Sequence, residues 1–200
     1  ARNQALKNAS GSSVIRAFSQ VMAPAAYRLV EGRRQWMNAL LPVLNPIHQH
    51  LAAGAENVSI NYEPSCSLPD PEAFNTLLIK AESRDTQSGS TSIGPHRDDF
   101  VFTVDGSNAR NFGSEGQQRT FILAFKLAQL DLLETKLQQK AVVLLDDVFT
   151  DLDPMRQQQA WSAFSRGRQI IASGTVIPEV AQKENWTLFS VCKGSIEPYA

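Results

Sequence analysis

The stretch AVVLLDD, residues 141–147, constrains the fold more than any other part of the sequence. Its five consecutive apolar residues predict a strand covered on both faces, as in parallel sheets. A helical pattern follows at residues 154–166 and a second strand, QIIAS, at residues 169–173. A short helix at 178–183 and a strand at 187–194 come next. Strands that alternate with helices predict an α/β fold with a parallel sheet.

Two carboxylates, Asp146 and Asp147, stand where the first strand ends. Ligands of α/β sheets bind at the carboxyl ends of strands. Neighbouring carboxylates repel each other unless a cation or a proton relieves them, and Mg²⁺ together with phosphate oxygens is the simplest relief. An apolar strand ending in aspartate fits the Walker B motif of ATPases, although ordinary strands also end this way. Asp151 and Asp153 follow, and Asp153 is the expected cap of a helix that begins at Pro154.

A polar turn, Ser114-Glu115-Gly116-Gln117, precedes a pattern at residues 116–135 that predicts a helix with apolar residues on all sides, and hence a buried one. The Ser-x-x-Gln spacing fits a capping box. Capping alone does not account for glycine in the first turn, which costs about 0.5–1 kcal/mol relative to alanine. Exposed amides, a hydroxyl and the positive end of a helix dipole form an anion site. We therefore favour a phosphate site over a plain cap.

The first half of the chain has a mainly helical pattern. Residues 12–54 have helical spacing, with Pro24, Pro42 and Pro46 expected to kink or divide the helix and Gly54 to end it. We also expect a strand at 57–64, a short helix near 74–82, a flexible connection at 83–95, and a strand at 100–106 with 109–112 as its hairpin partner. The chain opens in a helical pattern without Met, as expected of a piece of a longer protein.

Composition excludes several classes of protein. The chain has 200 residues, of which 42% are hydrophobic and 20% charged, which suits one or two domains with a core. No apolar run is long enough for a membrane span, and the start has no signal-peptide core. Cys66 and Cys192 lie far apart and predict neither a disulfide framework nor a zinc site. A reducing cytoplasm is the expected location.

Charge is distributed unevenly along the chain. The net charge is −1, yet residues 1–50 hold six Lys or Arg and one Glu. A basic segment of this kind could meet nucleic-acid phosphate, and Arg28, Arg33 and Arg34 are the candidates for contact with the DNA backbone. A solvated helix face explains the same residues equally well.

Several of these stretches together resemble one family. The order of a Ser-x-Gly-Gln helix start, an apolar strand ending in Asp-Asp and a Thr-Asp-Leu-Asp loop is shared by ABC-type ATPases and the structural-maintenance-of-chromosomes group. More narrowly, GSTSIGPHRDDF, GSEGQQRTFILAFKLAQLDLL, VVLLDDVFTDLD, FSVCKGSI and the initial RNQALK resemble the RecF family of bacterial recombination mediators. The likeness spans nearly the whole chain and is strongest over residues 89–153.

The resemblance implies an α/β fold that is the C-terminal part of an ABC-type ATPase head, residues 93–200, with a mainly helical inserted lid domain, residues 1–92. Proteins of this family hold ATP with Mg²⁺ between two heads as they form a homodimer. They act on DNA at gaps together with the RecO and RecR partners.

Residue by residue, the resemblance implies specific roles. Ser114, Gly116 and Gln117 would be the signature that faces the γ-phosphate of ATP held by the opposite subunit. Asp146 would orient Mg²⁺ through water. Asp147 would be catalytic, at the position where most ABC-type relatives have a glutamate that polarises the attacking water. Asp153, of the D-loop, would lie across the dimer interface.

Departures from the wider ABC pattern suggest slow hydrolysis, with ATP as a dimerisation switch. Asp147 is one methylene shorter than glutamate, and Gly174 and Thr175 stand where a switch histidine is expected. No G-x-x-x-x-G-K-[ST] P-loop occurs in the sequence, and in the family it lies upstream. We therefore expect this polypeptide alone neither to bind ATP tightly nor to hydrolyse it.

Two other readings of the whole chain stay open: another ABC-type head, and a non-enzymatic interaction module whose acidic loops are only caps. A P-loop upstream of this chain would favour an ATPase. The absence of a P-loop would favour the interaction module.

Smaller polar groups also have alternatives. The cluster His96-Arg97-Asp98-Asp99 could supply three metal ligands, but we favour mutual pairing at the junction of lid and head. Arg119 could contact phosphate or pair with an acid. His48 and His50 should diverge on a helix and not form a ligand pair.

Overall fold

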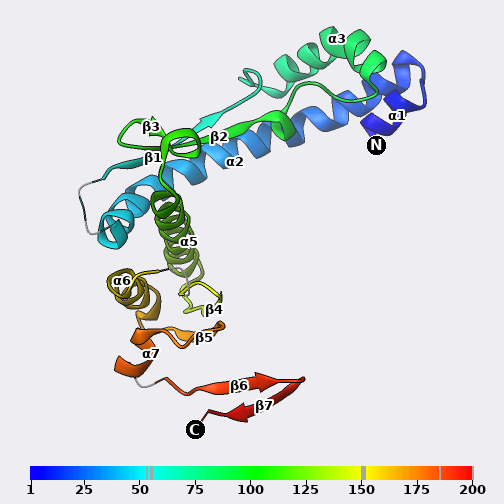
Figure 1. Ribbon diagram of the computed structural model, residues 1–200. Coiled ribbons are helices and arrows are strands. Elements are labelled where there is room, and N and C mark those ends of the chain that lie inside the picture. Colours follow the sequence, from blue (N-terminus) through cyan, green and yellow to red (C-terminus); the bar gives the residue numbers. More distant parts are fainter. Residues whose placement is uncertain (53, 55, 150–151, 185, 200) are drawn as a thin grey trace. The chain divides into compact units, whose positions relative to one another are not determined.

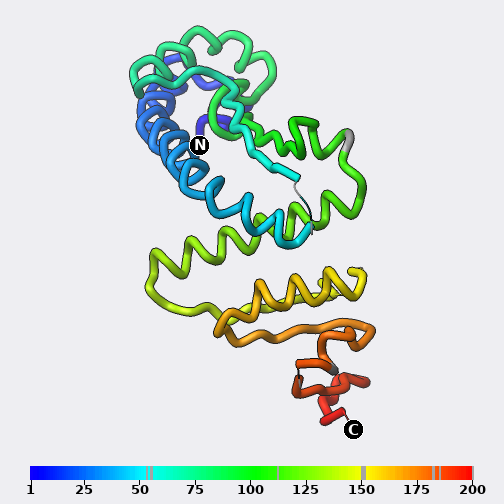
Figure 2. Tube along the Cα trace, turned by 90° about the vertical axis from the view of Figure 1, so that its left-hand side faces the viewer, coloured from blue at the N-terminus to red at the C-terminus, as the bar shows by residue number. Residues whose placement is uncertain are grey.

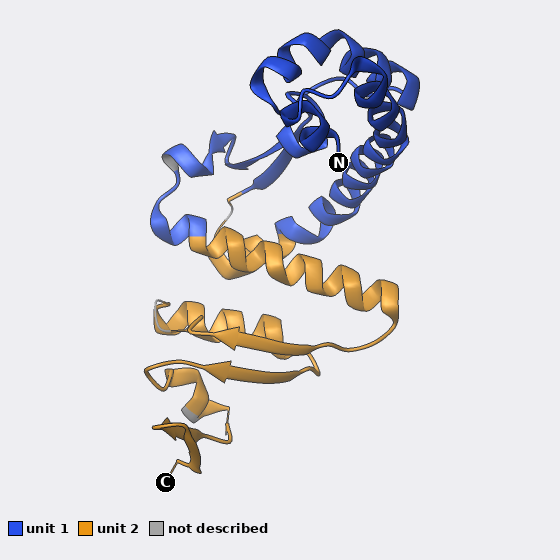
Figure 3. Ribbon diagram, turned by 90° about the vertical axis from the view of Figure 1, so that its right-hand side faces the viewer, with its two compact units in different colours: residues 1–45, 57–118 blue, residues 46–56, 119–200 orange. Residues whose placement is uncertain are grey.

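The computed structural model describes residues 1–52, 54, 56–149, 152–184 and 186–199. By packing, the chain forms two compact units, shown in Figure 3. Unit 1 comprises Ala1–Asn45 and Asn57–Gln118, and unit 2 comprises Pro46–Glu56 and Arg119–Ala200. The expected division into a lid, residues 1–92, and a head, residues 93–200, concerns function and stays a prediction.

The long helix α2 dominates the first part of the chain. The helices here are α1 (Arg2–Lys7), α2 (Ser12–Ala52) and α3 (Pro71–Ser88), labelled in Figure 1. The prolines were expected to kink or divide the helix; division is wrong, because α2 runs through Pro24, Pro42 and Pro46 as one helix, traced in Figure 2. Each internal proline costs about 3 kcal/mol. A buried stripe at three- and four-residue spacing opposes that cost; it includes Ala23, Ala26, Val30, Met37, Leu40 and Leu44.

Helix α3 is longer than the sequence pattern suggested. Asp70 caps it by accepting a hydrogen bond from the Ala73 N–H at 2.7 Å. The helix continues to Ser88, where Gly89 adopts a left-handed conformation with φ 64°. The first six residues of the expected flexible connection are therefore helical, because no glycine interrupts the pattern before Gly89.

An antiparallel sheet of three strands completes unit 1. Its strands are β1 (Val58–Glu63), β2 (Asp99–Val104) and β3 (Ser107–Asn108), in that order. The predicted strand at 109–112 is wrong, since these residues form the helical turn α4 (Ala109–Phe112). Asn108 favours the helix because its side-chain oxygen accepts a hydrogen bond from the Arg110 N–H at 3.0 Å.

The second half of the chain has the predicted α/β order. Its elements are α5 (Glu115–Leu137), β4 (Val142–Asp146), α6 (Pro154–Ser165), β5 (Gln169–Ser173), α7 (Glu179–Lys183) and the hairpin β6 (Phe189–Cys192) and β7 (Ser195–Pro198). β4 and β5 pair in parallel, with Asp146 opposite Ser173. The α/β class and the parallel pairing are confirmed.

Burial of this half is one-sided, which corrects two predictions. β4 is not covered on both faces, because Leu144 is 74% exposed while Val143 and Leu145 are buried. Helix α5 is not buried all round, because Ile122 and Leu133 are exposed opposite a buried face that includes Ala124. An apolar pattern shows which faces of an element can be buried, whereas the described residues cover one face of β4 and one face of α5.

The remaining bulk predictions concern membranes and thiols. Across the described residues, no helix combines the length and the apolar character needed to cross a membrane. Cys66 is half-buried, Cys192 is exposed, and both are free thiols.

Candidate functional site

The turn before α5 is a capping box. The Ser114 N–H donates to Gln117 Oε1 at 2.9 Å, and the Gln117 N–H donates to Ser114 Oγ at 3.2 Å. The predicted cap is therefore confirmed. It does not exclude a ligand, because a hydroxyl that accepts one hydrogen bond still has a proton to donate. Ser114 is exposed at the N-terminus of a helix of 23 residues, while Gly116 and Gln117 are half-exposed.

The backbone that leads into this turn is tightly packed. A Cβ atom at Gly113 would lie 2.6 Å from the carbonyl oxygen of Ala109 in the preceding turn α4. The Gly113 carbonyl in turn accepts a hydrogen bond from Gln118 Nε2 at 3.0 Å. Gly113 thus allows α4 and α5 to follow each other with only Gly113 and Ser114 between them.

The carboxyl end of the parallel sheet carries a second polar group. Asp146 is exposed at the end of β4, and its Oδ1 accepts a hydrogen bond from Ser173 Oγ, at the end of β5, at 2.5 Å. Asp147 follows with a left-handed φ of 54°, and its N–H donates to the Ser173 carbonyl at 2.9 Å. Ser173 was missed at the sequence level, although the parallel pairing of the two strands would have placed it beside Asp146.

These oxygens fit Mg²⁺ in kind. Mg²⁺ prefers hard oxygen ligands, keeps several waters and takes one or two carboxylates together with phosphate oxygens. The sheet end offers the exposed Asp146 carboxylate with an adjacent serine hydroxyl. Phosphate oxygens and water would have to supply the remaining ligands of the metal ion.

The loop after β4 is hydrogen-bonded to helix α6. Asp153 caps this helix, as predicted, because its Oδ1 accepts a hydrogen bond from the Arg156 N–H at 2.9 Å. Gln157 is buried, and its Nε2 donates to the carbonyls of Phe149 and Leu152 at 3.0 Å each. Gln157 was not singled out from the sequence, since a buried glutamine has no local signature. Residues 150–151 of this loop, including Asp151, lie outside the described residues.

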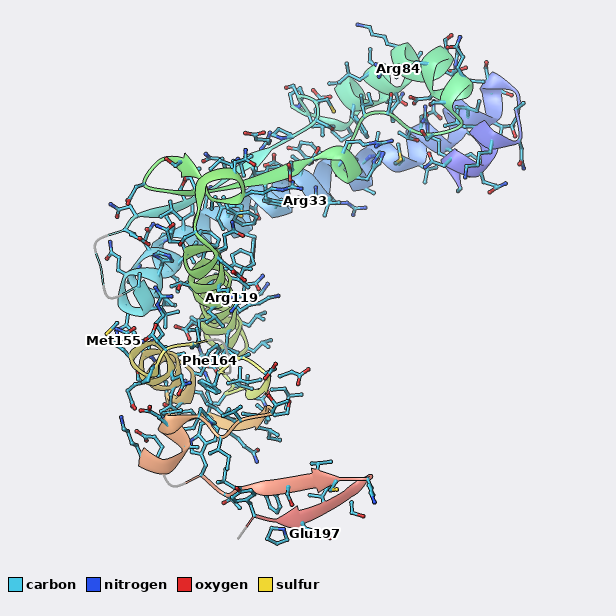
Figure 4. All side chains as sticks on the ribbon, in the orientation of Figure 1. Arg33, Arg84, Arg119, Met155, Phe164 and Glu197 are labelled. Atoms are coloured by element: carbon cyan, nitrogen blue, oxygen red, sulfur yellow. The ribbon has the colours of Figure 1, made fainter. Side chains whose placement is uncertain are left out.

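The candidate DNA-contacting arginines differ in their surroundings. Arg28 is exposed, and Arg34 is exposed beside Glu31 at 2.6 Å. Arg33 instead donates to the Pro95 carbonyl at 2.7 Å and to Asp98 at 3.1 Å. Its guanidinium also lies 5.8 Å from the centres of two aromatic rings, and it is labelled in Figure 4. The structure thus gives Arg33 a packing role, and the DNA contact stays a prediction for all three.

The cluster at residues 96–99 does not pair within itself, which corrects that prediction. Asp98, with a fully buried side chain, accepts hydrogen bonds from the Tyr62 hydroxyl, the Arg33 guanidinium and the Ser65 N–H. His96 Nε2 lies 2.9 Å from the Thr91 carbonyl oxygen. Burial, and then the hydrogen bond to Asp98, raise the pKa of Tyr62.

No metal-binding arrangement accompanies this cluster. Among the residues that the structure describes, no group of three or more His, Cys, Asp or Glu is placed to hold a metal ion. The Gly-Pro-His-Arg-Asp-Asp stretch is instead a structural joint, in which Asp98 ties α2 to β1.

The remaining candidates from the sequence are the histidine pair and Arg119. His48 is buried beside the Phe121 ring, whereas His50 is exposed with its Nε2 3.2 Å from Ser162 Oγ, so the two imidazoles diverge as predicted. Arg119 is half-exposed on the second turn of α5 and is labelled in Figure 4. Its role in phosphate contact stays a prediction.

Comparison with known proteins identifies a likeness to RecF. No protein-family model matches the chain. The chain is 34% identical over 196 residues to the DNA replication and repair protein RecF of Geobacillus kaustophilus. The aligned segment covers 94% of this chain and 53% of that protein. It is 37% identical over 171 residues to RecF of Agathobacter rectalis, covering 84% of this chain and 46% of that protein.

A solved structure agrees with these sequence relatives. The structure of the recombination mediator protein RecF with ATP, in the RecFOR pathway, matches all of this chain and 55% of its own chain, with a TM-score of 0.80 and 25% identity. The chain is thus a RecF-like sequence that spans about half the length of the relatives it matches. The resemblance inferred from the sequence motifs is confirmed.

Proposed function

From the likeness to RecF, we propose that this chain is part of a DNA-repair protein that dimerises on binding ATP and acts on DNA at gaps. The observation that carries the proposal is the exposed Ser114 hydroxyl in a capping box at the head of a 23-residue helix. A solved relative was determined with ATP, which supports a nucleotide as the ligand of the full-length protein.

In this proposal the signature turn binds the γ-phosphate of ATP held by the opposite subunit. Ser114 donates its hydroxyl proton, and Gly116 admits the phosphate close to the backbone because it has no side chain. Gln117 holds the turn through its hydrogen bonds with Ser114. The helix dipole of α5 adds a favourable field at this end.

At the sheet end, Asp146 and Ser173 would hold Mg²⁺ through water molecules. The metal, when bound, neutralises phosphate charge. Asp147 accepts a hydrogen bond from the attacking water and orients it. Asp147 follows the strand with a left-handed backbone, φ 54°. Because aspartate is one methylene shorter than glutamate, we expect it to reach the water poorly and hydrolysis to be slow. Asp153 would lie across the dimer interface.

The remaining functions belong to the whole protein. A P-loop from outside these 200 residues would complete the site, so we expect the chain alone to be inactive. RecO and RecR are the expected partners, because the solved relative belongs to the RecFOR pathway. Arg28 and Arg34, both exposed, are the better candidates for DNA-backbone contact. The cytoplasm is the expected location.

The experiment that tests the proposal is light scattering on the full-length protein with and without Mg·ATP. Ser114→Arg places a long side chain in the signature turn and should block dimerisation while ATP binding persists. Ser107→Arg, at an exposed serine of β3, is the matched control and should dimerise like wild type. If Ser114→Arg dimerises normally, the turn is only a helix cap and an interaction module becomes the better description.

A further inference from the structure

A buried arginine, Arg168, joins the far end of helix α5 to the start of strand β5. Its side chain is 1% exposed. Nε donates to Glu134 Oε1 at 2.7 Å, and Nη2 donates to Asp131 Oδ1 at 2.5 Å and to Glu134 Oε2 at 2.9 Å. Both acceptors are on α5, within its last two turns.

The same guanidinium also ends α6. Nη1 donates to the carbonyl oxygens of Ala163 and Phe164 at 3.2 Å each; Phe164 is labelled in Figure 4. These carbonyls belong to the last turn of α6, where a helix has no backbone partners of its own. Because a guanidinium has five N–H donors, all of its hydrogen-bonding capacity is used.

Glu134 extends the connection to strand β4. Its Oε1 accepts the N–H of Ala141, the residue before β4, at 2.9 Å, and its Oε2 accepts Lys140 Nζ at 2.9 Å. The hydrogen bond from Arg168, supported by those from Ala141 and Lys140, holds the pKa of Glu134 well below its usual range. Arg168, Glu134, Asp131 and Lys140 thus form one charged cluster. Its hydrogen bonds connect the starts of β4 and β5 with the C-terminal ends of α5 and α6.

The cluster lies opposite the candidate metal-binding end of the sheet. Asp146 and Ser173 stand at the carboxyl ends of the strands that begin here, about 17 Å away at the usual rise of a strand. On α5, the cluster is at the opposite end of the helix from the signature turn. Its members line an open hollow of about 430 Å³, so water reaches its rim.

We propose that Arg168 is a positioning residue that fixes the register of the signature helix α5 on the β4–β5 sheet. This rests on the proposed function, since the turn at the head of α5 must meet a nucleotide. A buried ion pair contributes little net stability compared with apolar packing, and its best-attested role is to specify register. Because a helix is a stiff rod, a shift of α5 along β5 is carried to the Ser114 hydroxyl.

The test uses the full-length protein carrying Arg168→Met, which keeps the side-chain volume and removes all five donors. Mg·ATP binding, ATP-dependent dimerisation and thermal unfolding are measured side by side. We expect ATP binding within twofold of wild type and dimerisation weakened about tenfold or more, since small misplacements of a contact have effects of this size. A residue that only stabilises the fold would lower the unfolding temperature and leave dimerisation in the cold unchanged.

Arg166→Met is the matched control. Arg166 is 54% exposed at the side chain and lies 3.6 Å from Asp131, so its loss removes the same charge without the buried contacts. It should dimerise normally. If Arg168→Met does not fold, Arg168→Lys, which keeps the charge but loses the forked geometry, is measured instead and should show the same weakening.

The outcomes separate the two proposals. If wild type dimerises with ATP and the Arg168 variant that folds dimerises equally well, the register role is overturned and the proposed function stands. The register role is also overturned if Arg166→Met weakens ATP-dependent dimerisation as much as the Arg168 variant does. If wild type does not respond to ATP at all, the proposed function fails, and the role of Arg168 fails with it.

Discussion

Replacing Asp98 with alanine should destabilise unit 1 by about 3 kcal/mol. The carboxylate is fully buried and accepts three hydrogen bonds, including those from Arg33 at 3.1 Å and the Ser65 N–H at 2.8 Å. Removing one partner of a buried ion pair costs about 3–5 kcal/mol. The lower end applies because the Arg33 side chain is 27% exposed and keeps its bond to the Pro95 carbonyl.

Urea unfolding measured by tryptophan fluorescence can detect this change. Trp36 is in unit 1, so a background in which Trp161 and Trp186 are phenylalanine reports on that unit alone. The adjacent Asp99→Ala is the control, since Asp99 is exposed, and it should change the free energy of unfolding by less than about 0.5 kcal/mol. A loss below about 1 kcal/mol for Asp98→Ala, or an equal loss for both variants, would refute the assignment of Asp98 as a structural joint.

Two further predictions concern stability. Because the pKa of Glu134 is lowered from a usual value of 4.5, its ionised form stabilises unit 2 above that pH, and the stabilisation is lost as the pH falls through the folded-state value. Glu134→Gln should therefore unfold with a flatter acid limb below about pH 4.5, measured by circular dichroism; an unchanged limb would contradict this. Gly94→Ala should cost about 3 kcal/mol or more, because φ is 120° and the new Cβ would lie 2.9 Å from the Phe74 ring. Gly106→Ala, with φ 79° and nothing within 4 Å, separates the backbone strain from the clash and should cost only about 1–2 kcal/mol in the same urea titration.

Local features of the structure were predictable because their causes lie within a few residues. The capping box at Ser114 and Gln117 and the cap at Asp153 depend on contacts three residues apart. The parallel strands ending at Asp146 and Ser173 follow from apolar runs and turn residues. Helix α2 was harder, since Pro42 is a local signal to break the helix that long-range packing overrides.

Charged side chains were misjudged for the opposite reason: their partners are remote in sequence. The basic count over residues 1–50 suggested a phosphate-binding surface, yet Arg2 is buried against Asp85, 83 residues away, at 2.8 Å. Arg16 pairs with Glu82 and Arg33 with Asp98. Composition records how many charges a segment has, and only the fold records how many remain for a ligand.

The same argument separates residues that hold the structure from those available for binding nucleotide. The side chains of Arg168 and Asp98 are both buried, and their hydrogen-bond partners are remote in sequence or belong to neighbouring helices. Ser114 and Asp146 are exposed at the ends of a helix and a strand, and among the described residues the side chain of each has a hydrogen bond with one neighbour, Gln117 or Ser173. A ligand gains most from groups that are already oriented but still solvated, because little must be broken to reach them. By this criterion we propose the signature turn and the sheet end, and not the buried clusters around Asp98 and Arg168, as the parts of this chain that bind phosphate and its metal.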